Sequence, residues 1–160
     1  MAMPLHKLDL LTGYGITFGA VGALQAGVAS FVAYVLMGVD TDAPAGVVIV
    51  LAISNAVCGM ALGLSIGAFA KTEFQAVQFM PAVILPQILV CGLFVARDQM
   101  AEWLQRVSDV LPLTYAYGAL DEVAKDGEMT DDAWVDLAVV VGVTLLLLAL
   151  GATTLRRRTP

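Results

Sequence analysis

The side chains in this sequence that could carry chemistry are polar residues placed inside long apolar runs. They are Gln25, Ser54, Asn55, Ser65, Gln75, Gln78, Gln87 and Thr144. Each can form a hydrogen bond between helices, which in lipid is worth about 1 kcal/mol. We interpret them first as interhelical hydrogen bonds, with contact to a transported substrate as the alternative.

The same apolar runs contain no charged side chains. No Asp, Glu, Lys, Arg or His lies in residues 14–39, 43–70, 74–96 or 137–155. Ionisable residues within a membrane usually mark proton relays and ion sites, so a self-sufficient proton-driven antiporter is disfavoured. The sequence also has no GxxxxGK[ST] phosphate loop and no Ser/His or metal-ligand set. We therefore predict no catalytic residues, no metal and no cofactor bound by this chain.

The composition is typical of a membrane protein. Of the 160 residues, 59% are hydrophobic and 14% are charged, whereas soluble domains have about 45–50% and about 25%. Lys and Arg total only 8, which gives no support to nucleic-acid binding. Cys58 and Cys91 lie in apolar runs without metal or redox spacing, and we interpret them as small packing residues.

Four uncharged runs are long enough to cross a bilayer, which takes about 20 apolar residues in a helix. They are residues 14–39, 43–70, 74–96 and 137–155. None alternates with the period of two that a β-barrel needs. We predict an all-α polytopic protein, in which residues 1–160 form a single transmembrane domain with four spanning helices.

The charges at the ends of these runs predict the orientation. Lys7, Lys71 and Arg156 to Arg158 all flank the runs on one side. The connection of residues 97–136 has three basic residues against ten acidic ones. Because basic loops stay in the cytoplasm, we predict cytoplasmic termini and an outer segment over residues 97–136. The expected location is the bacterial inner (plasma) membrane.

The third run is interrupted by Pro81 and Pro86, each of which removes a backbone donor and clashes with the preceding turn. We predict a kinked or locally unwound helix, opened by Thr72 as N-cap with Gln75 three residues later. Broken helices of this kind line cavities in transporters, and the alternative is a merely bent helix. The candidate substrate path is Gln75, Gln78, Pro81, Pro86 and Gln87.

After Ala96 the charges return in an amphipathic pattern. Trp103, Leu104 and Val107 share a face opposite Glu102 and Arg106, which suits the membrane interface. Pro112 ends this piece, and a second short helix is expected over residues 114–125. We predict a re-entrant or interfacial outer hairpin, with candidate residues Trp103, Leu104, Pro112, Thr114 and Tyr115.

The later part of the chain carries a series of short motifs: Phe79-Met80-Pro81, Leu85-Pro86-Gln87, Cys91-Gly92-Leu93-Phe94-Val95, Trp103-Leu104 and Leu111-Pro112-Leu113-Thr114-Tyr115. Together they resemble the C-terminal half of ABC-2 type permeases, in particular the daunorubicin-resistance type of drug-efflux permease. Residues 4–14 resemble the cytoplasmic coupling segment that precedes the third span of that family. The resemblance covers nearly the whole chain.

The resemblance implies the membrane subunit of an exporter of drug- or lipid-like compounds. Such permeases dimerise, so a second copy or another permease chain is implied, with the substrate path at the dimer interface. A separate ABC ATPase subunit would bind ATP and dock on the coupling segment. That segment is residues 1–13, with Pro4, Leu5, His6, Lys7, Leu8 and Asp9 as the coupling residues. The family has six spans, and its first two are expected to be missing from this sequence.

Two other functions stay open. The first is a membrane scaffold or assembly protein that packs through glycine-bearing helix faces and transports nothing. The second is a small homodimeric multidrug transporter, which the lack of an intramembrane carboxylate disfavours. Two further spans encoded upstream of Met1, or a neighbouring ATPase gene, would favour the permease.

Overall fold

The computed structural model describes residues 7–38, 43–70 and 72–154, and all regular elements in these ranges are helical. The elements are α1 (Lys7–Phe31), a π-helical turn (Val32–Leu36), α2 (Ala45–Phe69), α3 (Glu73–Val90), a 3₁₀ turn (Arg97–Gln99), α4 (Glu102–Ser108), α5 (Pro112–Asp126) and α6 (Asp131–Thr154). Four segments are long and apolar enough to cross a membrane: Gly19–Leu36, Ala45–Phe69, Glu73–Val90 and Asp131–Gly151. The prediction of an all-α protein with four spanning helices is confirmed.

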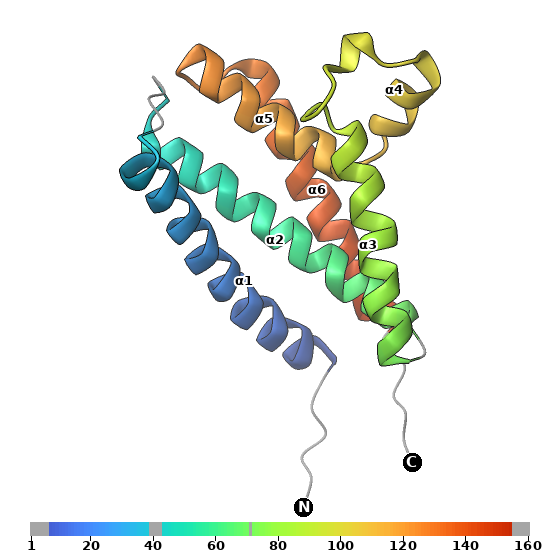
Figure 1. The fold of residues 1–160 in the computed structure, drawn as a ribbon. Coiled ribbons are helices and arrows are strands. Elements are labelled where there is room, and N and C mark those ends of the chain that lie inside the picture. The colour runs from blue at the N-terminus through green and yellow to red at the C-terminus, as the bar shows by residue number, and fades with distance from the viewer. Residues whose placement is uncertain (1–6, 39–42, 71, 155–160) are drawn as a thin grey trace, which may run out of the picture.

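The four long helices form a bundle, and each of them runs between the two ends of this bundle (Figure 1). The start of α1, the junction of α2 with α3 and the end of α6 lie together, and we name this the Lys7 end. The short helices α4 and α5 and the start of α6 lie at the opposite end, which we name the hairpin end. This arrangement is the one expected when consecutive spans run antiparallel.

Helix α2 is the centre of the bundle and contacts α1, α3, α5 and α6. Its Leu51 is buried with Ala119 of α5 and Ala133 of α6. Glycine permits close approach to α1, since a Cβ added at Gly22 would lie 3.1 Å from the Cβ of Ala56. Small residues allow this closeness, which drives helix association in lipid.

Polar side chains in the spans form two kinds of hydrogen bond. Asn55 Nδ2 donates to the Ala116 carbonyl at 3.0 Å, and Ser65 Oγ donates to the Leu147 carbonyl at 3.1 Å. These two confirm the prediction of interhelical bonds. Ser54, Gln87 and Thr144 instead donate to carbonyls four residues earlier in their own helices.

Helix α3 runs through Pro81 and Pro86 without a break. The locally unwound alternative is therefore not what the structure has. The predicted cap is confirmed, because the Thr72 hydroxyl accepts a hydrogen bond from the Gln75 N–H at 3.2 Å. The helix ends at Val90, six residues before the end of the predicted run, where Gly92 adopts a φ of 106° that glycine permits.

The other helices also differ from the predicted runs at their ends. Helix α1 already begins at Lys7, so residues 7–13 of the predicted coupling segment are the first turns of that helix. Helix α6 begins at Asp131, six residues before the predicted run. Its first turns therefore carry Asp136, one residue ahead of the uncharged stretch.

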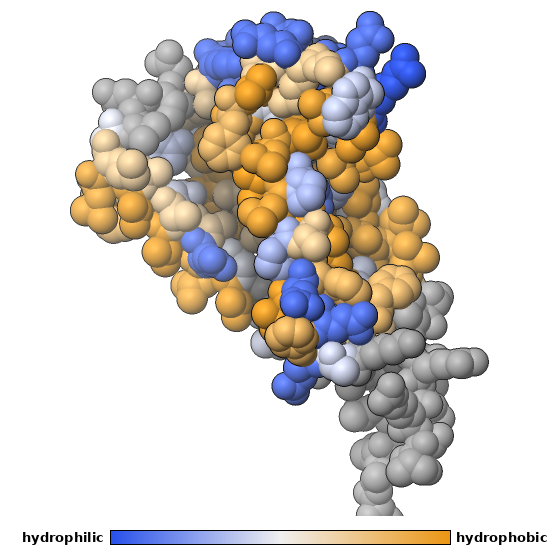
Figure 2. All heavy atoms as spheres, turned by 45° about the vertical axis from the view of Figure 1, so that its right-hand side comes forward, coloured by the Kyte–Doolittle hydropathy of each residue, from blue (hydrophilic) through white to orange (hydrophobic). Residues whose placement is uncertain are grey.

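Large apolar side chains remain exposed along the long helices. On α1, Ile16 and Leu24 are 73% and 71% exposed; on α3, Phe74 and Val77 are 71% and 70% exposed. Figure 2 shows a broad hydrophobic surface below a hydrophilic cap at the hairpin end. Such a surface suits contact with lipid or with further helices.

Candidate functional site

The hairpin end is built around α5, whose sequence defines both of its ends. Pro112 stands in the first turn, where its missing N–H leaves no bond unmade. Gly127 closes the helix with a φ of 75°, and its N–H donates to the Val123 carbonyl. The two signals give a 15-residue helix from Pro112 to Asp126.

Helix α5 lies beside the first half of α2, which is the half at the hairpin end, and not beyond the end of α2. Ala116 accepts the hydrogen bond from Asn55 and packs in a buried cluster with Cys58 and Val140. Asn55 is ten residues into α2, which corresponds to a depth of about 15 Å along the helix. The first turns of α5 are therefore packed among the spanning helices.

A buried hydroxyl network joins the end of α3 to the hairpin. Ser108 is fully buried, and its Oγ donates to the Val90 carbonyl at 2.8 Å and contacts Thr114 Oγ1 at 2.9 Å. Thr114 Oγ1 in turn donates to the Ser108 carbonyl at 2.8 Å. The two hydroxyls thus fasten α4 and α5 to the last turn of α3.

Two exposed interactions at Asp109 reinforce this junction. The Arg97 guanidinium forms a salt bridge with the Asp109 carboxylate, and the Tyr115 hydroxyl donates to the Asp109 carbonyl at 2.6 Å. Exposed ion pairs contribute at most about 1 kcal/mol to stability. The hydrogen bond of Tyr115 is therefore the more important of the two interactions, because it fixes the position of the Tyr115 ring.

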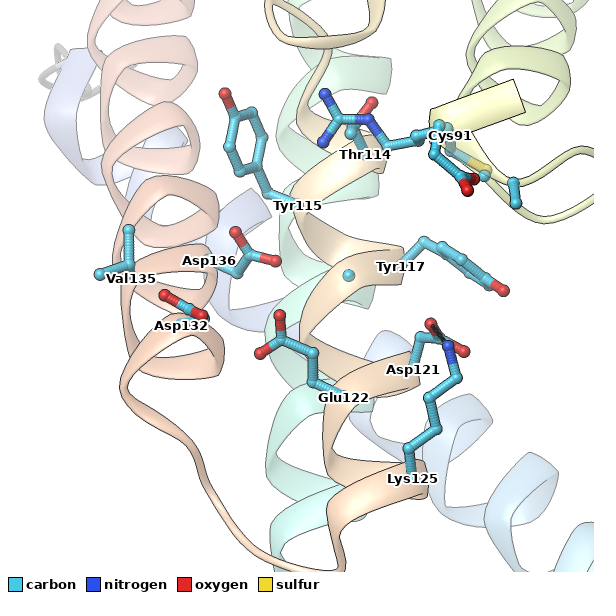
Figure 3. A pocket seen from close by; sticks show the side chains of 15 residues that line it. Cys91, Thr114, Tyr115, Tyr117, Asp121, Glu122, Lys125, Asp132, Val135 and Asp136 are labelled. Carbon is cyan, nitrogen blue, oxygen red and sulfur yellow. Dashed lines mark hydrogen bonds and ion pairs between the residues drawn. The ribbon is translucent and has the colours of Figure 1, made fainter. Parts of the chain in front are cut away.

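A cavity of about 560 Å³ lies over the polar face of α5. We name it the outer cavity. It is bounded by α6, by the segment of residues 91–98, and by α5 itself; its lining includes Cys91, Arg97, Tyr115, Tyr117, Gly118, Asp121, Glu122, Lys125, Asp132 and Asp136. Figure 3 shows the Glu122 and Asp136 carboxylates extending toward each other across the space between α5 and α6.

Acidic residues outnumber basic ones in the outer cavity. Its lining has five carboxylates, adding Asp98 to the four above, and two bases. Lys125 Nζ lies 2.6 Å from Asp121 Oδ2, and this hydrogen-bonded carboxylate raises the pKa of Lys125. Burial, and then the charge of Asp121, raises the pKa of Tyr117. No group of three or more His, Cys, Asp or Glu among the described residues is placed to hold a metal ion.

Gly118 provides the room for this arrangement. A Cβ added there would overlap Asp136 Oδ2. The Asp136 carboxylate therefore lies directly on the backbone of α5, a contact that only glycine allows.

The structure does not gather the five predicted path residues into one lining. Gln78, Pro81 and Pro86 are exposed on α3, and Gln75 is half-buried. Gln87 is only 2% exposed; its Nε2 donates to the Val83 carbonyl, while its Oε1 is buried without a hydrogen-bond partner. Gln87 therefore has a buried amide oxygen with unused bonding capacity.

The predicted hairpin residues lie together at the hairpin end. Pro112 and Thr114 are buried, Leu104 and Tyr115 are half-buried, and Trp103 is 67% exposed. Of the predicted coupling residues, Pro4, Leu5 and His6 lie outside the described residues, and Lys7, Leu8 and Asp9 open α1.

A family model described as ABC-2 type transporter matches residues 1–123. The chain belongs to the ABC-2 type transporter family. The matched segment takes in α1 to α4 and most of α5, including the Ser108–Thr114 network. ABC-2 proteins of this kind are membrane transport components and not the ATPase.

Two relatives agree with this assignment. Over 150 residues the chain is 24% identical to the linearmycin resistance permease protein LnrN of Bacillus subtilis (strain 168), covering 94% of this chain and 37% of that protein. Over 165 residues it is 24% identical to ABC transporter G family member 20 of Dictyostelium discoideum, covering 95% of this chain and 23% of that protein. This ABC-2 chain thus spans well under half of each relative, and no solved structure matches it.

Sequence reasoning missed three features of the site. Ser108 was one polar residue among several in an amphipathic helix, and nothing in its spacing indicates burial. Gly118 and Asp136 are 18 residues apart in the sequence, so their contact depends on how α5 packs on α6. A signal for Asp136 existed, since a carboxylate one residue before an apolar run is costly to place near lipid.

Proposed function

We propose that this chain forms part of the export path of an ABC-2 exporter that moves drug- or lipid-like amphiphiles out of the cell. The observation that carries the proposal is the family match over residues 1–123, which covers most of the bundle. The name of the Bacillus relative, a resistance permease, supports removal of a toxic compound. The energy would come from ATP hydrolysis in a separate ABC ATPase subunit.

The proposed orientation places the Lys7 end in the cytoplasm of a bacterial cell and the hairpin end outside. The acidic excess of residues 97–136 supports it. In this orientation the α4–α5 pair is a re-entrant hairpin of the outer leaflet. The bond from Asn55 to Ala116 supports re-entry, because it ties α5 to a residue well inside a spanning helix.

The proposed coupling surface is the chain start, Pro4 to Asp9, at the end where an ATPase subunit would dock. Lys7, Leu8 and Asp9 supply the first turn of α1 there. Deleting residues 4–9 should abolish efflux and co-purification with the ATPase subunit, while the helix content in circular dichroism stays unchanged. Co-purification that survives the deletion would contradict this role.

The proposed substrate path runs along α3, with Gln87 as its principal polar contact. Gln87 Oε1 has no hydrogen-bond partner and would accept one from a substrate that displaces the groups covering it, whereas Gln75, Gln78, Pro81 and Pro86 would be further contacts elsewhere around α3. The exposed apolar side of α3 supports a second copy, or a partner permease chain, completing the path, with lipid around the remainder.

Drug susceptibility tests the proposed function. Deleting the gene in its own organism should lower the minimal inhibitory concentration of amphiphilic antibiotics, linearmycin among them, several-fold. A plasmid copy should restore it, and a small hydrophilic antibiotic serves as the control. Unchanged susceptibility together with unchanged efflux of preloaded amphiphilic dyes would favour the scaffold instead.

A further inference from the structure

The outer cavity has the size of a small-molecule site. Its volume of about 560 Å³ falls in the range of about 300–1,000 Å³ typical of ligand pockets. It lies within one chain, between α5, α6 and residues 91–98, and needs no second copy for its walls. Gln87 is not among its lining residues.

The charges of the outer cavity select the sign of a ligand. Lys125 is paired with Asp121 and Arg97 with Asp109, so both bases of the lining already have an anionic partner. Among the described residues, Glu122, Asp132 and Asp136 form no salt bridge. Glu122 does accept a hydrogen bond from the Thr130 hydroxyl at 2.8 Å. An anion would therefore face carboxylates that no base neutralises, which disfavour it, whereas a cation would be attracted.

The remaining lining favours an organic cation over a metal ion. No three carboxylates in the described part of the chain are grouped for metal coordination. Tyr115 and Tyr117 bring aromatic rings to the wall, and the hydroxyl of Tyr115 is held by the Asp109 carbonyl. Aromatic faces attract large, weakly hydrated cations, and Val135 adds apolar contact.

We propose that the outer cavity binds a monovalent organic cation of drug size, with Asp132, Asp136 and Glu122 facing the charge and Tyr115 and Tyr117 contacting the apolar body. This inference deepens the proposed function by naming a class of compound for the outer side. Binding can nevertheless be measured without transport, so the two can fail separately.

A pair of ions with the same shape and opposite charge provides the test. The full chain is placed in phosphatidylcholine nanodiscs, and equilibrium dialysis measures binding of tetraphenylphosphonium and of tetraphenylborate, with empty nanodiscs subtracted. We expect saturable binding of the cation, at one site per chain, and no saturable binding of the anion. Saturable binding of both ions, or of neither, would overturn the proposal.

Charge-neutral variants locate the binding. Asp132→Asn combined with Asp136→Asn should weaken cation binding about tenfold or more, because two unpaired carboxylates are lost. Glu128→Gln, an exposed acidic residue outside the lining, should change it less than about twofold. Equal effects of the two changes would overturn the site. Cation binding without any efflux would leave this inference standing and contradict the proposed function.

Discussion

Ser108 is the residue on which the attachment of the hairpin depends most. It has no exposed surface, and its hydroxyl connects the Val90 carbonyl on α3 with Thr114 on α5. Removing the hydroxyl would leave the hydrogen-bonding groups of both neighbours buried with fewer partners. A buried polar group without a partner costs about 1–3 kcal/mol.

Ser108→Ala should accordingly lower the free energy of unfolding by about 1–3 kcal/mol. Ser54→Ala is the matched control, because the Ser54 hydroxyl bonds only to the carbonyl four residues earlier in its own helix. The control should cost less than about 0.5 kcal/mol. Reversible unfolding in mixed micelles measures both, and equal losses would contradict the network.

Gln87→Leu separates a structural role from a transport role. The change removes a buried oxygen that has no partner, so stability should stay within about 0.5 kcal/mol of wild type or rise. Efflux should fall, because the proposed substrate contact is lost. Gln25→Leu, at an exposed position on α1, is the control and should leave efflux unchanged. Normal efflux by Gln87→Leu would remove Gln87 from the path.

At the scale of elements, the packing of α5 on α6 depends on one glycine. The Asp136 carboxylate occupies the place where a side chain at Gly118 would begin. Any larger residue must displace Asp136 into the outer cavity or push the two helices apart. Gly142 of α6 provides the comparison, because a Cβ added there would have no atom within 4 Å.

Gly118→Ala should destabilise the protein by about 1–3 kcal/mol, as overpacking does. Gly142→Ala should be neutral or slightly stabilising, since alanine favours a helix by up to about 1 kcal/mol. Unfolding in mixed micelles again measures the difference. A neutral Gly118→Ala would show that α5 and α6 are not packed this closely.

The helices could largely be predicted from the sequence, whereas their ends were predicted less accurately. In lipid, an uncharged run of about 20 residues satisfies its backbone hydrogen bonds by forming a helix, so the four spans follow directly from the sequence. The cap at Thr72 also follows from local chemistry. The continuity of α3 through Pro81 and Pro86 did not follow, because a proline can bend a helix without ending it and the sequence does not distinguish the two outcomes.

The candidate site was predicted less completely than the fold. Thr114 and Tyr115 were predicted as hairpin residues, but the contacts that make them important involve Ser108 and Asp109. The outer cavity combines residues from three separate segments. Spacing along one helix cannot predict such a combination.

At the scale of the whole molecule, the orientation can be read with single cysteines. Glu128 lies at the hairpin end and Glu73 at the Lys7 end, and both are exposed. In intact cells a membrane-impermeant maleimide should label Glu128→Cys, whereas Glu73→Cys should be labelled only after permeabilisation. Cys58 and Cys91 are buried and give a low background. The reverse pattern would invert the topology.

The position of Asp136 raises the question whether transport by this protein is driven by protons or by ATP. Asp136 lies in the first turns of a spanning helix and lines the outer cavity, so a carboxylate is present at one end of α6. A proton-driven transporter would need such a group. The proposed function is instead a permease driven by ATP hydrolysis in a separate subunit. The two mechanisms predict different sensitivity to ATP and to the proton gradient.

The most direct test is dye efflux from intact cells that express this protein with the proposed ATPase subunit, under two treatments. Arsenate depletes ATP, while a protonophore collapses the proton gradient in cells whose ATP is maintained by glycolysis. We predict that arsenate stops efflux and that the protonophore leaves it largely intact. Efflux that continues without ATP and stops with the protonophore would contradict an ATP-driven permease.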